Sequence, residues 1–175
     1  PADSIIAHTS GSHSLEILNS FRSQSAVFYP FQTMSKGKQV DFVHIPICLE
    51  AQEAQVYQQL EQLAKQLSPK VHQVSSESRK KLHLAAVFAC NFANHAWAIA
   101  ENILAESNMD FSMMHHLIKE TLEKALALKP SQSQTGPAIR NDGNIIKAHL
   151  EMLQKEDFKQ VYETMTESIQ QFDRD

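Results

Sequence analysis

Glycine is scarce in this chain of 175 residues, and its scarcity excludes one common way of binding phosphates. The four glycines are Gly11, Gly37, Gly136 and Gly143. None of them is spaced as G-x-G-x-x-G, the turn that lets a backbone approach a pyrophosphate at a helix N-terminus. We therefore do not expect a chain of this composition to bind a dinucleotide tightly by itself.

Several other absences narrow the class of protein. No apolar run approaches the roughly 20 residues that cross a bilayer, so no membrane partner is expected. The net charge is −4 and no basic stripe follows a helix, which argues against nucleic acid as a partner. The nine histidines show no metal-ligand spacing, so no metal is expected. The two cysteines, Cys48 and Cys90, are predicted to be buried free thiols, and no signal peptide is visible, which favours a cytoplasmic protein.

The first part of the chain alternates between strand and helix patterns. Short β-prone runs predict strands, and apolar residues at helical spacing predict helices. Pro46 indicates that one of the strands lies at a sheet edge. Strands are predicted over 4–8, 25–29, 42–49 and 70–74, and helices over 13–21 and 51–67. This alternation is typical of an α/β fold with a largely parallel sheet.

The remaining residues show only helical patterns. The helix predicted over 76–107 has an alanine-rich stripe that allows another helix to pack closely against it. Ser112 is the predicted N-cap of the helix over 112–128. Helices are predicted over 76–107, 112–128, 143–154 and 157–173. We therefore expect two domains, an α/β part over 1–75 and an all-α part over 76–175.

Four motifs in this order resemble a family of proteins assigned as NAD(P)-dependent oxidoreductases, which are related to pyrroline-carboxylate reductase and 6-phosphogluconate dehydrogenase-like proteins. The motifs are HTSG (8–11), YPFQTM (29–34), LHLAAVFACNF (82–92) and TGPAIRND (135–142). The resemblance covers the chain from about Ile5 to about Met165. It implies the second part of a Rossmann-like sheet followed by a helical domain, with NADP or NAD as the cofactor of the intact protein. It also implies that the N-terminal glycine-rich half lies outside this sequence.

His8, Thr9, Ser10 and Gly11 follow a predicted strand at its carboxyl end, where open α/β sheets bind ligands. We expect these residues to contact cofactor or substrate, and the resemblance places Pro30 beside the nicotinamide. The alternatives are a simple turn in which Ser12 caps a helix, and a rigid proline turn with Phe31 in the core.

His83 and Asn91 are the candidate catalytic residues. They are eight residues apart on one predicted helix, and histidine is suited to acid or base chemistry near neutral pH. Relatives of the 6-phosphogluconate type carry a lysine four residues before the asparagine, whereas this chain has Val87. The alternative is a buried polar pair with a structural role.

Thr135, Gly136, Arg140 and Asp142 are the candidate substrate-binding residues. Arginine binds carboxylates in a bidentate manner, which favours a small anionic substrate. The alternative is a helix cap in which Asp142 caps residues 143–154 and pairs with Arg140.

Two functions follow from these patterns. The first is an NAD(P)-dependent oxidoreductase with a small-molecule substrate bound between the sheet edge and the helical domain. The second is a non-catalytic dinucleotide- or metabolite-binding protein on the same scaffold. The alanine-rich helix, together with the family resemblance, predicts a homodimer through the helical domain.

Overall fold

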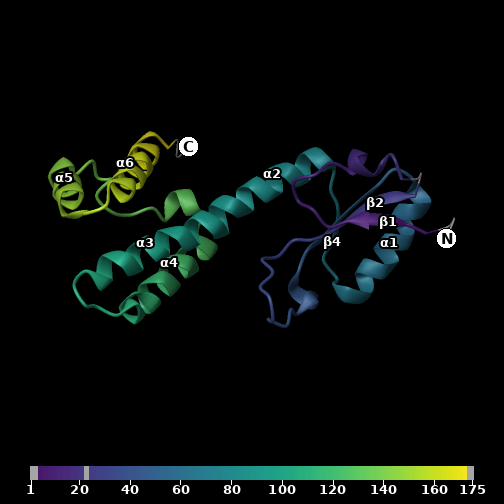
Figure 1. Cartoon of the computed structure of the whole chain (residues 1–175), viewed down its shortest axis with the longest axis horizontal. Helices are drawn as coiled ribbons and strands as arrows, with labels where there is room; N and C mark the ends of the chain where they lie inside the picture. Colours follow the sequence, from purple (N-terminus) through teal and green to yellow (C-terminus); the bar gives the residue numbers. More distant parts are fainter. Residues whose placement is uncertain (1–3, 22–23, 173–175) are drawn as a thin grey trace. The chain divides into compact units, whose positions relative to one another are not determined.

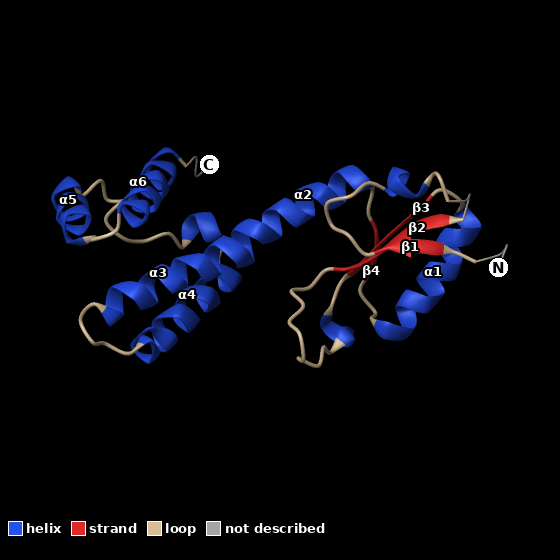
Figure 2. Ribbon diagram, in the orientation of Figure 1, coloured by secondary structure: helices blue, strands red, loops and turns tan. Residues whose placement is uncertain are grey.

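The computed structural model describes residues 4–21 and 24–172, and contacts divide the chain into two units, residues 1–92 and 93–175. Figure 1 follows the chain through its elements, and Figure 2 separates the helices from the strands. All strands of the described chain belong to the first unit, and the second unit is helical.

A mixed four-stranded sheet forms the centre of the first unit, with strand order β1-β2-β3-β4. The strands are β1 (Ile6–His8), β2 (Ser25–Pro30), β3 (Ile47–Ala51) and β4 (Val71–Gln73). β1 pairs with β2 in parallel, β2 with β3 antiparallel, and β3 with β4 in parallel. Because β1 and β2 are parallel, their carboxyl ends lie at the same edge of the sheet.

Each face of the sheet has its own apolar cluster, because successive side chains of a strand point to opposite faces. On one face, Ala26, Ile47 and Leu49 pack against helix α1 (Ala54–Leu67). On the other, Val27 packs against the short helix η1 (Leu15–Leu18). Tyr29 also packs on this second cluster, away from α1.

A long helical run follows β4. It consists of α2 (Ser76–Ala86), a π-helical segment η3 (Val87–Phe92) and α3 (Ala93–Ala105). The Ser75 hydroxyl accepts a hydrogen bond from the Ser78 amide, which satisfies a donor of the first turn. Helical spacing in the sequence predicts this run, but not its π-helical segment.

The second unit contains α3, α4 (His115–Ala127), α5 (Gly143–Met152) and α6 (Glu156–Gln171). Three short 3₁₀ helices complete the described elements: η2 (Phe42–His44), η4 (Phe111–Met114) and η5 (Pro130–Gln132). In the second unit, Leu104 and Ala138 are the buried apolar residues of the described part. No described helix is both long and apolar enough to cross a bilayer.

The predicted α/β-then-helical fold class is confirmed, and some local predictions are wrong. Strand β3 begins at Ile47 and lies between β2 and β4, so Pro46 does not mark an edge strand. The carbonyl of Pro46 accepts a hydrogen bond from the Phe31 amide at 2.8 Å. Ser112 does not cap α4: it lies within the 3₁₀ helix η4 that precedes α4, and Asp110 is the N-cap of η4. Helix α6 ends at Gln171, and the predicted end at residue 173 lies outside the described residues. The domain boundary at residue 75 stays a prediction.

Candidate functional site

A cavity of about 400 Å³ lies in the first unit, at the carboxyl end of β2. One wall consists of Tyr29 and the loop after β2, and the other of one face of α2 and η3. The lining residues are Tyr29, Phe31, Gln32, Thr33, Met34, His83, Ala86, Val87, Cys90 and Asn91. Hydroxyl, amide and imidazole groups are thus combined with apolar side chains, as is usual in small-molecule sites.

Hydrogen bonds fix the loop that follows β2. Pro30, the last residue of the strand, is paired with Ile47, and the Phe31 amide donates to the Pro46 carbonyl. The side-chain oxygen of Gln32 accepts from the Thr33 amide at 2.8 Å. The ring of Phe31 packs edge-on against Tyr29, with the centroids 6.0 Å apart. The loop is therefore a defined wall of the cavity, and Pro30 begins it without lining the cavity itself.

His83 and Asn91 both line this cavity, and the π-helical segment between them contributes to that arrangement. In a regular α-helix, a spacing of eight residues leaves about 80° between two side chains. A π turn closes its hydrogen bond over five residues instead of four, so each residue turns less about the axis. Residues 87 to 92 therefore rotate Asn91 back towards the face of His83. The two predicted catalytic residues are brought together.

Gly11 connects the first loop to the same group of residues. Gly11 is buried, and a Cβ at its position would lie 2.8 Å from both the Tyr29 hydroxyl and Nδ1 of His83. The Tyr29 hydroxyl and Nδ1 of His83 are themselves 3.4 Å apart and form a hydrogen bond. The loop after β1, the end of β2 and helix α2 therefore converge beside the cavity.

His8 is held in its neutral form at the end of β1. Its Nδ1 accepts from the Ser10 amide at 3.1 Å, and its buried Nε2 has no hydrogen-bond partner among the described residues. Burial, and then the positive charge of Arg79, lower the pKa of His8 below its ordinary value of 6.5. Thr9 is exposed. The Ser10 hydroxyl accepts from the amides of Ser12 and His13, so Ser10 rather than Ser12 stabilises the turn.

A buried arginine holds this loop in place. Arg79 is fully buried; its Nε donates to the Ser10 carbonyl at 3.2 Å and its Nη2 to the His13 carbonyl at 2.6 Å. Its Nη1 pairs with Glu50 of β3. Burial raises the pKa of Glu50, but hydrogen bonds from Arg79 and Ser76 outweigh burial and hold that pKa below 4.5. Arg79 therefore ties the loop after β1 to the sheet and to α2.

The predicted substrate-binding residues lie in the second unit. Asp142 caps α5 by accepting from the Ile145 amide at 3.2 Å, which confirms the predicted cap. Arg140 is exposed and forms no ion pair with Asp142 or with any other described carboxylate. Gly136 has a φ of +106°, a conformation that favours glycine. A substrate-binding role for these residues stays a prediction.

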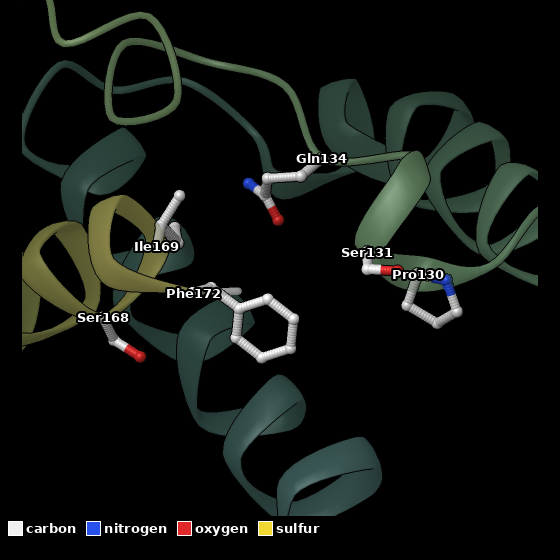
Figure 3. A pocket seen from close by; sticks show the side chains of 6 residues that line it. All are labelled: Pro130, Ser131, Gln134, Ser168, Ile169 and Phe172. Carbon is white, nitrogen blue, oxygen red and sulfur yellow. The ribbon is translucent and has the colours of Figure 1, made fainter. Parts of the chain in front are cut away.

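Two hollows occur within the second unit. Thr135 lines an apolar one of about 390 Å³, where the Tyr162 hydroxyl and Nδ1 of His149 are already hydrogen-bonded to each other at 2.8 Å. Figure 3 shows the other, about 190 Å³, between the segment of Pro130 and Gln134 on one side and, on the other, Ser168 of α6 and Phe172, which follows that helix. The lining of this second hollow contains no histidine, unlike that of the cavity in the first unit.

Tyr29 and Arg79 are the residues of this site that the sequence patterns did not single out. Tyr29 stands inside the YPFQTM motif, but its contact with His83 joins residues 54 positions apart. Arg79 lies in a polar stretch that is typical of an exposed first turn of a helix, and only the fold buries it. The cysteines are both free, as predicted, but Cys90 is exposed rather than buried. The described residues contain no cluster of three potential metal ligands.

The fold and the position of the cavity define a class of protein. The sheet and the following helices are those of a Rossmann-like α/β unit joined to a helical region. The chain belongs to the family described as Domain of unknown function (DUF2520), whose model matches residues 45–169.

Solved structures agree with this assignment. The chain is similar to a putative NADP oxidoreductase from Bacteroides fragilis, with 40% identity and a TM-score of 0.92 over 98% of this chain and 67% of that one. A protein from Thermotoga maritima has the same fold at 23% identity, with a TM-score of 0.74 over 94% of this chain and 67% of that one. A search of curated proteins gave no match.

Proposed function

We propose that the protein is part of an NADP- or NAD-dependent oxidoreductase whose reaction takes place at the cavity of the first unit. The observation that carries this proposal is the convergence of Gly11, Tyr29, His83 and Asn91 beside one cavity at the carboxyl end of β2. Ligands of open α/β sheets bind at this edge. The similarity to the Bacteroides fragilis protein supports the same class of reaction.

The residues of this edge fit the nicotinamide end of the cofactor. In our proposal, His8, Thr9, Ser10, Gly11 and Pro30 form the cofactor side of the site. His83 and Asn91 are the proposed catalytic residues, with Asn91 holding a carbonyl or hydroxyl of the substrate. The bound nicotinamide supplies hydride chemistry. No glycine-rich turn is present in residues 1–175 to hold the pyrophosphate.

We also propose a small anionic substrate whose negative group is bound by Arg140. The cavity lining contains no lysine or arginine, and the buried Arg79 already binds Glu50 and two backbone carbonyls. The exposed guanidinium of Arg140 is free of carboxylate partners among the described residues. Thr135, Gly136 and the cap residue Asp142 are proposed to belong to the same substrate-binding site as Arg140.

A titration tests the cofactor assignment. Because residues 1–175 carry only the nicotinamide side of the site, we expect NADPH to bind this chain no more tightly than reduced nicotinamide mononucleotide does. The longer Bacteroides fragilis relative serves as the positive control and should bind NADPH much more tightly. NMR or calorimetric titration provides both affinities.

A matched pair of variants locates the binding site. Cys90→Trp places a large ring in the cavity. Ala89→Trp places the same ring at the preceding residue of η3, which is exposed and does not line the cavity. We expect only the first to abolish binding of reduced nicotinamide mononucleotide. Equal loss in both variants, or tight NADPH binding by residues 1–175, means that the cofactor site lies elsewhere. Binding without turnover in the longer relative would favour the non-catalytic alternative.

We further propose that the protein is a homodimer through its helical unit. Large apolar side chains of this unit are exposed, including Leu126 at 77%, Met152 at 70% and Met113 at 63%. A unit of this length with so few buried apolar residues needs a partner surface to stabilise it. The occupant we propose is a second copy of the chain.

A further inference from the structure

We propose that Tyr29 is a positioning residue that fixes the tautomer of His83, so that the proton of the neutral imidazole sits on Nε2 and is available to the cavity. This inference rests on the proposed function, because it gives the site its proton donor. Nothing in the sequence motifs or the family description assigns a role to Tyr29.

The contact itself joins two separate elements. Tyr29 belongs to β2 and His83 to α2, and the Tyr29 hydroxyl lies 3.4 Å from Nδ1 of His83. Among the described residues, no hydrogen bond involves Nε2 of His83, although His83 lines the cavity. The two ring nitrogens therefore have different surroundings: Nδ1 is bonded to Tyr29, whereas Nε2 is left to bind a ligand.

In this proposal the Tyr29 hydroxyl is the donor of that hydrogen bond and Nδ1 of His83 is the acceptor. Burial, together with the neighbouring Cys48, raises the pKa of Tyr29 above 10, so its hydroxyl remains protonated at neutral pH. A phenol that donates to Nδ1 makes this nitrogen the acceptor, and a neutral imidazole then carries its proton on Nε2. His83 accordingly enters the reaction as a hydrogen-bond donor and not as a base.

The pair can deliver a proton to a substrate oxygen. A reduced nicotinamide held beside the cavity would supply the hydride for reduction of a carbonyl group, and the carbonyl oxygen would take the proton from Nε2 of His83. The Tyr29 proton passes to Nδ1 in the same step. One N–H and one O–H bond break, one O–H and one N–H bond form, and the carbonyl carbon gains the hydride. After the product leaves, Nε2 takes a proton from water and Nδ1 returns its proton to the Tyr29 oxygen, which restores the starting tautomer.

Gly11 provides the space for this pair. It does not adopt a positive φ, so glycine is required here for its size and not for its backbone conformation. A Cβ would lie 2.8 Å from the Tyr29 hydroxyl and 2.9 Å from Cγ of His83, closer than real Cβ contacts. Gly11→Ala is therefore a wedge that separates the two side chains without removing either.

The test measures the ¹⁵N shifts of the ring nitrogens of His83, because protonated and unprotonated imidazole nitrogens differ widely in shift. Residues 1–175 are labelled at histidine, and the His83 signals are assigned by their loss in His83→Gln. We expect the parent chain, measured at alkaline pH, to show a single Nε2–H tautomer. Tyr29→Phe and Gly11→Ala should convert it to a mixture of both tautomers.

Gly143→Ala is the matched control, because a Cβ at Gly143 meets nothing within 4 Å, and this variant should leave the His83 signals unchanged. The folded state of each variant is checked by the signals of the other histidines. An Nδ1–H tautomer in the parent chain, or unchanged His83 shifts in folded Tyr29→Phe, would overturn the proposal. The measurement needs no dinucleotide, so its outcome is distinct from failure of NADPH to bind, which would overturn the proposed function.

Discussion

At the scale of single residues, the fully buried charge of Arg79 has the largest structural consequence. Taking a guanidinium out of water is costly unless every donor is used and an opposite charge is near. Arg79 comes close to this condition, because four of its five N–H groups donate: to Glu50, to the carbonyls of Ser10 and His13, and to the Ser76 hydroxyl at 3.1 Å. These bonds fix the loop on either side of Gly11, so a charge remote from the cavity lining helps to hold Gly11 against Tyr29.

Glu50→Gln tests this network through pH. The hydrogen bonds from Arg79 and Ser76 outweigh burial and lower the folded pKa of Glu50 below 4.5. The stabilisation is therefore fully present above pH 4.5 and is lost as the pH falls through the lowered folded pKa. At pH 7 the variant leaves Arg79 unpaired, and we expect a loss of about 3 kcal/mol in the free energy of unfolding of the first unit.

The measurement is hydrogen exchange of the β3 amides, which reports on the sheet alone. The difference between parent and variant should shrink as the pH is lowered below 4.5. Lys81→Ala is the control, because its pair with Glu77 is exposed and such pairs contribute less than about 1 kcal/mol. A parent–variant difference that is constant from pH 7 down to strong acid would contradict the assigned role of Glu50.

At the scale of elements, the sequence predicted the type of most helices and strands, and tertiary contacts decided the rest. Apolar spacing located α1, α5 and α6 because one face of each carries regularly spaced apolar residues. The same spacing missed the π turn at 87–92, because a single widened turn hardly alters the apolar pattern. The β-prone composition of residues 42–44 wrongly extended the predicted strand back to residue 42, because these residues form a 3₁₀ helix before β3.

Some residues of the candidate site could likewise be predicted from local sequence patterns, whereas others depend on tertiary contacts. The positions of Gly11, His83 and Asn91 could be predicted from motifs that end a strand or repeat along one helix. The roles of Tyr29 and Arg79 could not, because each depends on a partner that only the folded sheet brings near.

The start of α5 allows a prediction at this scale. Asp142 accepts from the Ile145 amide, whereas Arg140 has no ion pair among the described residues. We expect Asp142→Ala to destabilise the helical unit by about 0.5–2 kcal/mol, as loss of a helix cap does. Arg140→Ala should change its stability by less than about 0.5 kcal/mol. Urea unfolding followed by Trp97, the single tryptophan, reports on this unit.

A reference variant completes that experiment. Asp110→Ala removes the cap of the 3₁₀ helix η4, where Asp110 accepts from the Ser112 amide at 2.8 Å, and it should also destabilise the helical unit, by about 0.5–2 kcal/mol. If Arg140→Ala proves as destabilising as Asp142→Ala, Arg140 has a structural role and is no longer a candidate for binding a substrate.

At the scale of the whole molecule, the two units differ in how completely they bury their apolar residues. The first has apolar clusters on both faces of its sheet, with Ala26, Val27 and Leu49 fully buried. The second unit leaves most of its large apolar side chains at least partly exposed to solvent. Because exposed patches of this kind mark association surfaces, the folding of the helical unit and its association with a second copy are expected to be coupled.

We therefore expect sedimentation to give a mass twice the 19.8 kDa of the chain and thermal unfolding to shift upwards with protein concentration. Leu126→Lys places a charge where the side chain is already 77% exposed, so it should weaken association without disturbing the fold of one copy. Phe21→Lys is the control, since Phe21 is 60% exposed but belongs to the first unit. A monomer at concentrations well above micromolar, with an unfolding temperature independent of concentration, would exclude the dimer. Equal dissociation by both variants would place the association surface outside the helical unit.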